Sequence, residues 1–222
     1  MRHTTFLSRP TSVAAIYLAV ALLVASVGCT KHKEEPKPET KEGPMNSKVL
    51  EGKSVLMIVA KQKFRDEELA EPRAILRTAG AKITIAASAL GESVGMLGRE
   101  RVTPDIKLDQ VDPTGYDAIV FIGGQGASEY WNDRTAQGIA TRAYEAGKVV
   151  GAICIAPVTL ANAGLLKGRK ATVYRSEKGA LVKGGANYTG AGVEVDGRII
   201  TADGPTSATE FGEAIRDALA GQ

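Results

Sequence analysis

The chain has 222 residues, of which 44% are hydrophobic and 24% charged, with a formal net charge of +3. Residues 1–48 hold all of this imbalance, because residues 49–222 carry 21 basic and 21 acidic side chains. A neutral folded part argues against a nucleic-acid partner, since binding to backbone phosphates needs a basic stripe. The remaining length of about 170 residues is enough for one sizeable core and short for two.

Residues 1–29 have the pattern of a bacterial secretory signal. Two arginines precede an apolar stretch, residues 13–27, that is too short to cross a bilayer as a stable helix. The sequence SVGC at 26–29 resembles a lipobox in which Cys29 is lipidated, with serine in place of the usual leucine. We therefore expect a lipid-anchored protein of the bacterial cell envelope, with an uncleaved anchor or plain secretion as the alternatives.

Residues 30–48 are interpreted as a disordered tether. They are charged, rich in proline and free of large apolar side chains, apart from a single methionine. Such a segment buries too little surface to offset its ordering entropy. The folded domain is therefore predicted to span residues 49–222, where Cys154 is the one cysteine and has no intrachain disulfide partner.

The first half of this domain is predicted to alternate strand and helix. Residues 53–60, KSVLMIVA, form a β-branched apolar run typical of a parallel strand that is buried on both faces. A polar loop, a helix over 66–79 and a second strand over 82–87 follow. Residues 88–116 are rich in glycine, proline and charge, and short strands or a hairpin are expected there.

The second half continues the alternation and predicts the fold class. A strand over 116–122, a glycine turn, a helix over 135–146 and a strand over 148–153 come first. Later elements are strands over 171–174, 192–195 and 198–202, a hairpin turn at 196–197 and an amphipathic helix over 207–220. The order predicts a single α/β domain with an open, mostly parallel sheet and helices on both faces.

Ligands of such sheets bind beyond the carboxyl ends of the strands. We therefore expect three loops to converge, at residues 61–68, 123–131 and 154–157.

Cys154 ends a buried strand just before a predicted helix, a pattern that indicates a nucleophile elbow. Free amides and the macrodipole at a helix start favour thiolate over thiol. The pattern thus predicts a Cys154 pKa below the ordinary value of about 8.5. A small buried side chain without chemistry is the alternative, since free cysteines are among the most buried residues.

Five segments in this order resemble the ThiJ/PfpI superfamily, which includes the Parkinson-disease-linked deglycase and chaperone and the PfpI-type peptidases. The segments are FRDEELAEP, AIVFIGGQG, AICIAP, ANAGLLKGRKAT and GRIITADGPTSATEF. The resemblance covers about residues 52–220. It implies a flavodoxin-like sheet, of the kind also found in class I glutamine amidotransferases, and a homodimer.

The resemblance also implies roles for particular residues. Cys154 matches the reactive cysteine, and Glu68 the carboxylic acid that hydrogen-bonds it. The backbone amides of Gly124 and Ile155 match a pair that binds an oxyanion. Burial beside a negative charge is expected to raise the pKa of Glu68. Glu67, one residue away, is expected to be a solvated charge.

Departures from the family restrict the function. Peptidase-like members carry histidine directly after the cysteine, where this chain has Ile155, and its two histidines lie at positions 3 and 32. A cysteine–histidine dyad within one domain is therefore excluded, as is a zinc site of histidine and cysteine ligands. No metal and no cofactor is expected, and the glycine turn lacks the spacing and lysine of a nucleotide-binding loop.

Four further residues are candidates for the pocket. Tyr174 stands where the deglycase-like branch has histidine, and Asp203 where it has arginine, so two cations that could hold an anionic substrate are replaced. Tyr130 and Trp131, just after the glycine turn, could line the pocket mouth or belong to the core.

Two functions remain open at this point. In the first, Cys154 attacks small reactive carbonyl compounds or the adducts that they leave on proteins, as a glyoxalase or deglycase does. In the second, the protein is a non-catalytic redox-sensing or chaperone-like stress protein whose Cys154 is oxidised to sulfinate. A cysteine peptidase is disfavoured because the domain has no histidine.

Overall fold

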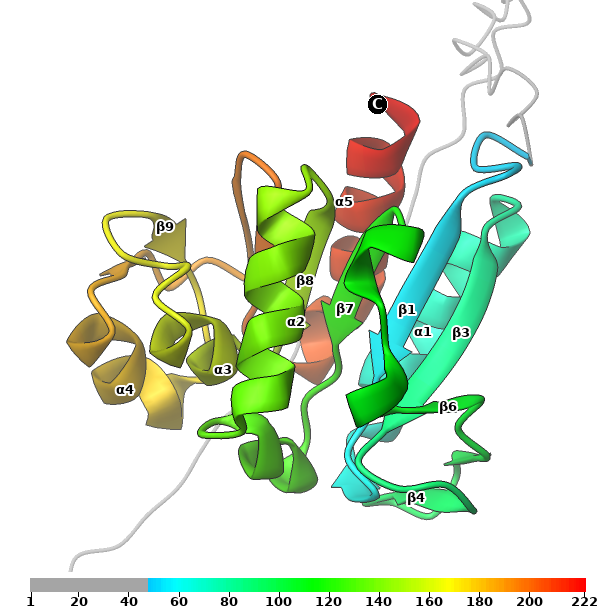
Figure 1. Cartoon of the computed structure of the whole chain (residues 1–222). Helices are drawn as coiled ribbons and strands as arrows, with labels where there is room; N and C mark the ends of the chain where they lie inside the picture. Colours follow the sequence, from blue (N-terminus) through cyan, green and yellow to red (C-terminus); the bar gives the residue numbers. More distant parts are fainter. Residues whose placement is uncertain (1–47) are drawn as a thin grey trace, which may run out of the picture. The chain divides into compact units, whose positions relative to one another are not determined.

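A seven-stranded sheet runs through the protein in the computed structural model, which describes residues 48–222 (Figure 1). The strand order is β11-β12-β8-β7-β1-β3-β6. Neighbouring strands are parallel except for the antiparallel pair β11 and β12. The bounds are β1 Ser54–Ile58, β3 Lys82–Ala87, β6 Ile106–Lys107, β7 Ala118–Phe121, β8 Val149–Ile153, β11 Val193–Asp196 and β12 Ile199–Ala202. The predicted open, mostly parallel α/β sheet is confirmed.

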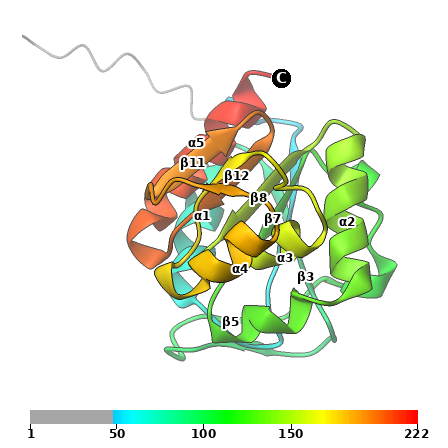
Figure 2. The same ribbon diagram turned by 90° about the vertical axis from the view of Figure 1, so that its left-hand side faces the viewer.

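Helices cover both faces of the sheet, and Figure 2 shows the sheet between them. One face packs against α1 (Asp66–Thr78) and α5 (Ala208–Ala220), and the other against α2 (Arg134–Glu145) and α3 (Pro157–Asn162). A further short helix, α4 (Lys178–Lys183), lies next to α3. The sheet therefore forms the middle of three layers, as in other open α/β domains.

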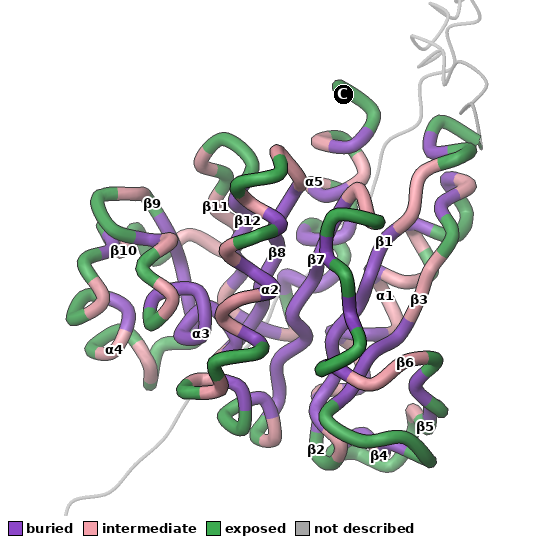
Figure 3. The backbone as a smooth tube through the Cα atoms, in the orientation of Figure 1, coloured by how far each residue is buried: buried purple, intermediate pink, exposed green. Residues whose placement is uncertain are grey.

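The central strands are buried on both faces, and the tube in Figure 3 is purple along them. Successive side chains of a strand point to opposite faces. Along β1, Val55 and Met57 accordingly belong to the core under α1 and α5, whereas Leu56 and Ile58 belong to the core under α2. This is why the strand reads as a continuous apolar run rather than an alternating one.

Two small sheets lie beside the main one. The first combines β2 (Gln62–Phe64), β4 (Ser93–Gly95) and β5 (Arg101–Val102), and the second pairs β9 (Lys170–Ala171) with β10 (Asn187–Tyr188). The antiparallel pair β4 and β5 is the hairpin that the glycine-rich segment predicts. Short 3-10 helices join the elements: η1 Leu108–Gln110, η2 Pro113–Gly115, η3 Gln125–Tyr130, η4 Arg175–Glu177 and η5 Pro205–Ser207.

Some local predictions were wrong. The loop expected at 61–65 contains β2, and the strand expected over 171–174 stops at Ala171. The helices η3 and α4 were not predicted, because they are too short to show a clear 3.6-residue period. In the β11–β12 hairpin Asp196 pairs with Ile199, so the turn consists of Gly197 and Arg198 rather than 196–197.

The predictions for residues 1–47, which are the signal, the lipidation of Cys29 and most of the tether, lie outside the described residues. In the part of the chain that the structure describes, none of the helices combines the length and apolar character needed to cross a bilayer.

Candidate active site

The site lies at the carboxyl edge of the sheet, where the segments after β1, β7 and β8 meet. A pocket of about 500 Å³ opens there. All three loops predicted to converge contribute to it, and the η4 segment and the β4–β5 turn add further residues. Its lining consists of Arg65, Glu68, Met96, Gly124, Gln125, Ser128, Trp131, Cys154, Ile155, Tyr174, Ser176, Glu177 and Pro205.

Cys154 occupies a sharp turn between β8 and α3. Its φ of 63° lies in the left-handed region, which non-glycine residues rarely adopt. Two backbone hydrogen bonds hold this conformation: the Cys154 amide donates to the Ala202 carbonyl at 2.9 Å, and the Tyr174 amide donates to the Cys154 carbonyl at 2.9 Å. Strained residues of this kind concentrate at functional sites, where the surrounding structure enforces them.

Gly123 and Gly124 allow the loop after β7 to approach the cysteine. A Cβ added to Gly123 would lie 2.5 Å from both the Cys154 Cβ and the Glu68 Oε2. Gly124 has a φ of 93°, and a Cβ there would collide with the backbone of Arg65. Both positions therefore need glycine, and the loop can direct the Gly124 amide toward the sulfur of Cys154.

Glu68, on the first turn of α1, is fully buried against the cysteine. Burial raises its pKa to about 8, although the neighbouring Cys154 thiol, the charge of Arg65 and the Gly123 amide act in the opposite direction. Its two carboxyl oxygens have no well-formed hydrogen bond within residues 48–222. A protonated carboxyl at neutral pH follows, in the direction that the sequence predicts.

The predicted fall in the pKa of Cys154 is corrected by the structure. Burial, followed by the negative charge of Glu68, raises the pKa of Cys154 to about 12. The amides of Gly124 and Ile155 lower it but do not prevail. The helix argument was too strong, because α3 begins three residues later at Pro157 and has six residues.

Trp131 and Tyr174 both line the pocket. The Trp131 indole donates to the Ile155 carbonyl at 3.0 Å, so it ties η3 to the turn that carries Cys154. Tyr174 is 48% exposed and follows β9 into the η4 segment. An exposed phenol at the pocket is free to meet a ligand.

Tyr130 and Asp203 lie elsewhere. The Tyr130 hydroxyl is buried, donates to the Val59 carbonyl at 2.8 Å and accepts from the Ser88 amide at 3.0 Å. Asp203 accepts from the Ser207 hydroxyl at 2.7 Å. These contacts indicate structural roles, and neither residue is part of the pocket lining.

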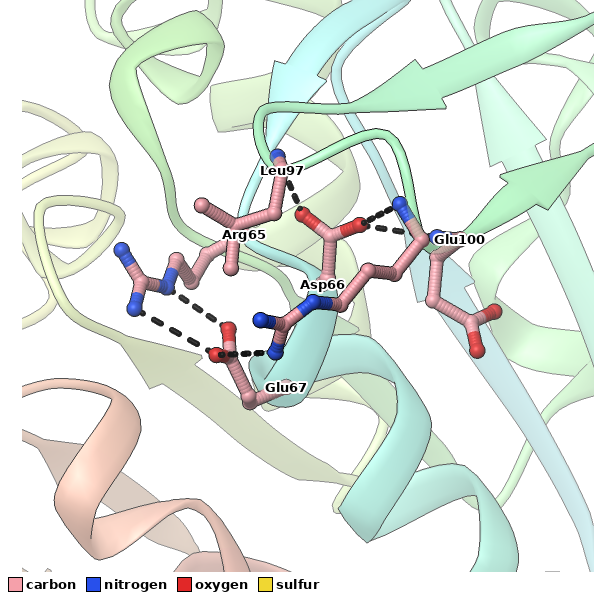
Figure 4. Close-up of polar contacts among 6 residues, drawn as sticks. Arg65, Asp66, Glu67, Leu97 and Glu100 are labelled. Atoms are coloured by element: carbon pink, nitrogen blue, oxygen red, sulfur yellow. Dashed lines mark hydrogen bonds and ion pairs between the residues drawn. The ribbon is translucent and has the colours of Figure 1, made fainter.

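Arg65 is a pocket residue that the sequence did not single out. Its Nε donates to Glu67 at 2.7 Å, and its Nη2 reaches the second oxygen of that carboxylate at 3.4 Å (Figure 4). Glu67 also lies 4.0 Å from Arg99, so it is not the solvated charge that was expected. A basic residue just before an acidic helix start was the available signal.

Asp66 binds the turn between β4 and β5. Its carboxylate accepts the backbone amides of Leu97, Arg99 and Glu100 at 2.8–2.9 Å (Figure 4). Burial acts to raise the pKa of Asp66, but these three bonds and the backbone amide of Asp66 itself lower it overall. Asp66 thereby attaches the β4–β5 turn to the start of α1, next to Glu68. The turn carries Met96, which reaches the pocket.

No group of three or more histidine, cysteine, aspartate or glutamate side chains able to hold a metal ion is found among residues 48–222.

Comparison with known sequences yields a family described as the DJ-1/PfpI family, which matches residues 53–218. An uncharacterised protein of Methanocaldococcus jannaschii is 41% identical over 92% of this chain and 96% of its own. A protein named as a deglycase from Pyrococcus horikoshii is 34% identical over 68% of this chain and 90% of its own.

Comparison with solved structures gives the same result. A ThiJ/PfpI domain protein from Brachyspira murdochii has a TM-score of 0.74 and 32% identity, over 76% of this chain and 97% of that one. DJ-1beta of Drosophila melanogaster has a TM-score of 0.69 and 31% identity, over 77% and 91% of the two chains.

Proposed function

Because the chain belongs to the DJ-1/PfpI family, we propose that it is an enzyme whose Cys154 attacks small reactive carbonyl compounds, as a glyoxalase or deglycase does. The arrangement around Cys154 is the observation that carries the proposal. A strained cysteine faces two backbone amides and a buried carboxyl, inside a pocket of about 500 Å³. Relatives named as deglycases support the same class of substrate.

The first step needs a route for the thiol proton. Glu68, with a pKa of about 8, is the better base of the pair, since the pKa of Cys154 is raised to about 12. The ionised carboxyl accepts the proton as the sulfur bonds to the carbonyl carbon. The π electrons of the carbonyl move to its oxygen. The negative charge thereby passes from the Glu68 carboxylate to the carbonyl oxygen.

The amides of Gly124 and Ile155 stabilise negative charge, first on the sulfur and then on the oxygen. Glu68 returns its proton to that oxygen and completes a hemithioacetal. With a 2-oxoaldehyde, the hydrogen of the former aldehyde carbon then shifts to the neighbouring carbonyl carbon, and the hydroxyl proton moves to the oxygen of that carbon, which gives a thioester. Water hydrolyses the thioester to a 2-hydroxy acid and restores the thiol.

In the decisive experiment, purified protein is incubated with methylglyoxal, and both the loss of methylglyoxal and the formation of lactate are measured. We expect wild type to produce lactate in step with methylglyoxal loss and Cys154→Ser to produce none. Trp131→Phe serves as a matched pocket variant, because it removes the hydrogen bond to Ile155 but neither reacting group. It should retain part of the activity.

Methylglyoxal loss without lactate, at equal rates in wild type and Cys154→Ser, would contradict the proposal. Oxidation of Cys154 to sulfinate by mild peroxide, in a protein without lactate formation, would instead favour the redox-sensing alternative.

A further inference from the structure

Arg65 is the cationic side chain among the residues that line the described pocket, and its surroundings leave one edge of it free. An arginine can bind carboxylates through two edges, the side formed by Nε and Nη2 and the end formed by Nη1 and Nη2. Glu67 occupies the side edge through bonds to Nε and Nη2. At the end edge, Nη2 already bonds Glu67 through one N–H, whereas Nη1 has no hydrogen-bond or ion-pair partner within residues 48–222.

The position of Arg65 is fixed by the backbone as well as by Glu67. Its amide donates to the Gly123 carbonyl at 3.0 Å, so the residue is attached to the loop that faces Cys154. Its side chain is 28% exposed, so a ligand can reach it. The rest of the side chain is buried, which strengthens its charge interactions. The guanidinium is held beside the reacting groups in a defined orientation.

Glu67 is the carboxylate paired with this cation, and it lies outside the pocket lining. Glu68 is protonated at neutral pH, because burial raises its pKa to about 8. Glu177 also lines the pocket, where its carboxylate accepts from the Ser176 hydroxyl on η4. Arg65 is close enough to Glu68 and Cys154 to interact electrostatically with both of them.

We propose that Arg65 recognises a carboxylate next to the reacting carbonyl, so that the site prefers 2-oxo acids of the glyoxylate type over neutral aldehydes. This rests on the proposed function for the carbonyl chemistry, and it adds the substrate class. The Cys154 sulfur bonds to the aldehyde carbon while its proton passes to one oxygen of the Glu68 carboxyl, and the carbonyl oxygen takes a proton from Glu68 in exchange. The carboxylate meanwhile stays on the free edge of Arg65, and Glu67 is the positioning residue that orients that edge.

The test compares two aldehydes of similar size, glyoxylate and glycolaldehyde, as protectants of Cys154 against iodoacetamide. Mass spectrometry of the Cys154 peptide measures the alkylation rate at each aldehyde concentration. We expect glyoxylate to protect wild type at a concentration about tenfold lower than glycolaldehyde, a difference of about 1.4 kcal/mol. Arg65→Gln should abolish this preference, and Arg65→Lys should keep part of it.

Arg99→Gln is the matched control. Arg99 also pairs with Glu67, but its side chain is 74% exposed and is not part of the pocket lining. It should therefore leave the preference unchanged. Equal protection by both aldehydes in wild type, or an unchanged preference in Arg65→Gln, would overturn the proposal.

A second readout does not depend on carbonyl chemistry. Iodoacetate is anionic and iodoacetamide neutral, so the ratio of their rates at Cys154 reports a nearby cation. We expect Arg65→Gln to lower this ratio several-fold and Arg99→Gln to preserve it. A lowered ratio in a protein that neither aldehyde protects would support anion recognition by Arg65 and refute the carbonyl function; an unchanged ratio would refute the role of Arg65.

Discussion

Glu68 and Cys154 are two acidic groups side by side in the wall of the pocket, and at most one of them carries a negative charge near neutral pH. Glu68 loses its proton with a pKa of about 8, and its negative charge is one reason why the pKa of Cys154 is raised to about 12. Two such groups do not both ionise near neutral pH. The reactivity of the sulfur is therefore governed by the carboxyl beside it.

We predict that Cys154 alkylation by iodoacetamide rises with pH through about pH 8 in wild type, because ionised Glu68 accepts the thiol proton. Glu68→Gln should lose this rise and react about 10²-fold more slowly at that pH, the lower end of the usual contribution of a general base. The measurement is the alkylation rate at the Cys154 peptide as a function of pH.

Glu67→Gln is a suitable control, since Glu67 is the neighbouring carboxylate and binds Arg65 rather than Cys154. It should retain the inflection, moved to lower pH because the charge of Glu67 helps to raise the pKa of Glu68. A Glu68→Gln protein with the wild-type pH profile would show that the carboxyl takes no part in activating the sulfur.

For single residues, the sequence predicted the neighbours of Cys154 better than it predicted the pKa of its thiol. The α/β order located the segments that carry Glu68 and Cys154 at one edge of the sheet, and the family resemblance paired these two side chains. The pKa of Cys154 was predicted in the wrong direction, because depth of burial depends on contacts between distant segments. Arg65 was overlooked for the same reason: its neighbours are brought together by the fold.

Among the elements, the turn of the β4–β5 hairpin is bound by one buried carboxylate, that of Asp66. Asp66 is 2% exposed and accepts three backbone amides from the turn between these strands. Two-residue pairings such as those of β4 with β5 are too short to be stable alone. Asp66, together with the ion pair between Arg73 of α1 and Glu100, holds the hairpin and its Met96 against α1.

We predict that Asp66→Asn lowers the free energy of unfolding by about 2–4 kcal/mol, because an uncharged amide cannot replace a carboxylate that accepts three amides. Hydrogen exchange should also become faster at the Leu97, Arg99 and Glu100 amides. Chemical denaturation and peptide-resolved exchange measure the two effects.

Asp109→Asn, at an exposed carboxylate that pairs with Lys107, should change neither quantity noticeably. Unchanged protection of the turn amides in Asp66→Asn would contradict the role assigned to Asp66.

The long elements were predictable and the short ones were not. The helices α1, α2 and α5 have apolar faces with a clear period, and the central strands are continuous apolar runs. By contrast, β2 and α4 cover only a few residues each and form through contacts with β4 and α3. Nothing local in their sequences distinguishes them from loops.

For the molecule as a whole, a buried carboxyl with a raised pKa makes stability depend on pH. Below the ordinary glutamate pKa of 4.5, Glu68 is protonated in both the folded and the unfolded state. As the pH rises toward about 8, the unfolded chain releases this proton and the folded one keeps it. The free energy of unfolding therefore falls as the pH rises through this range, by up to about 1.4 kcal/mol per pH unit.

We predict that the free energy of unfolding of wild type, relative to that of Glu68→Gln, falls as the pH rises from 4.5 to about 8 and is constant above it. Urea denaturation at intervals across this range provides the comparison. Using the difference between the two proteins removes the contribution of Asp66, whose lowered pKa acts in the acidic range. A difference that does not vary with pH would mean that Glu68 ionises in the folded protein at its ordinary pKa of 4.5.

The chain contains a single tryptophan, and the structure places it at the pocket. The Trp131 indole donates to the carbonyl of Ile155, the residue after Cys154. Any adduct, oxidation or bound ligand that shifts this turn changes the environment of the only indole in the protein. Intrinsic fluorescence is therefore a built-in optical reporter, with which events at the sulfur can be timed by rapid mixing in unlabelled protein.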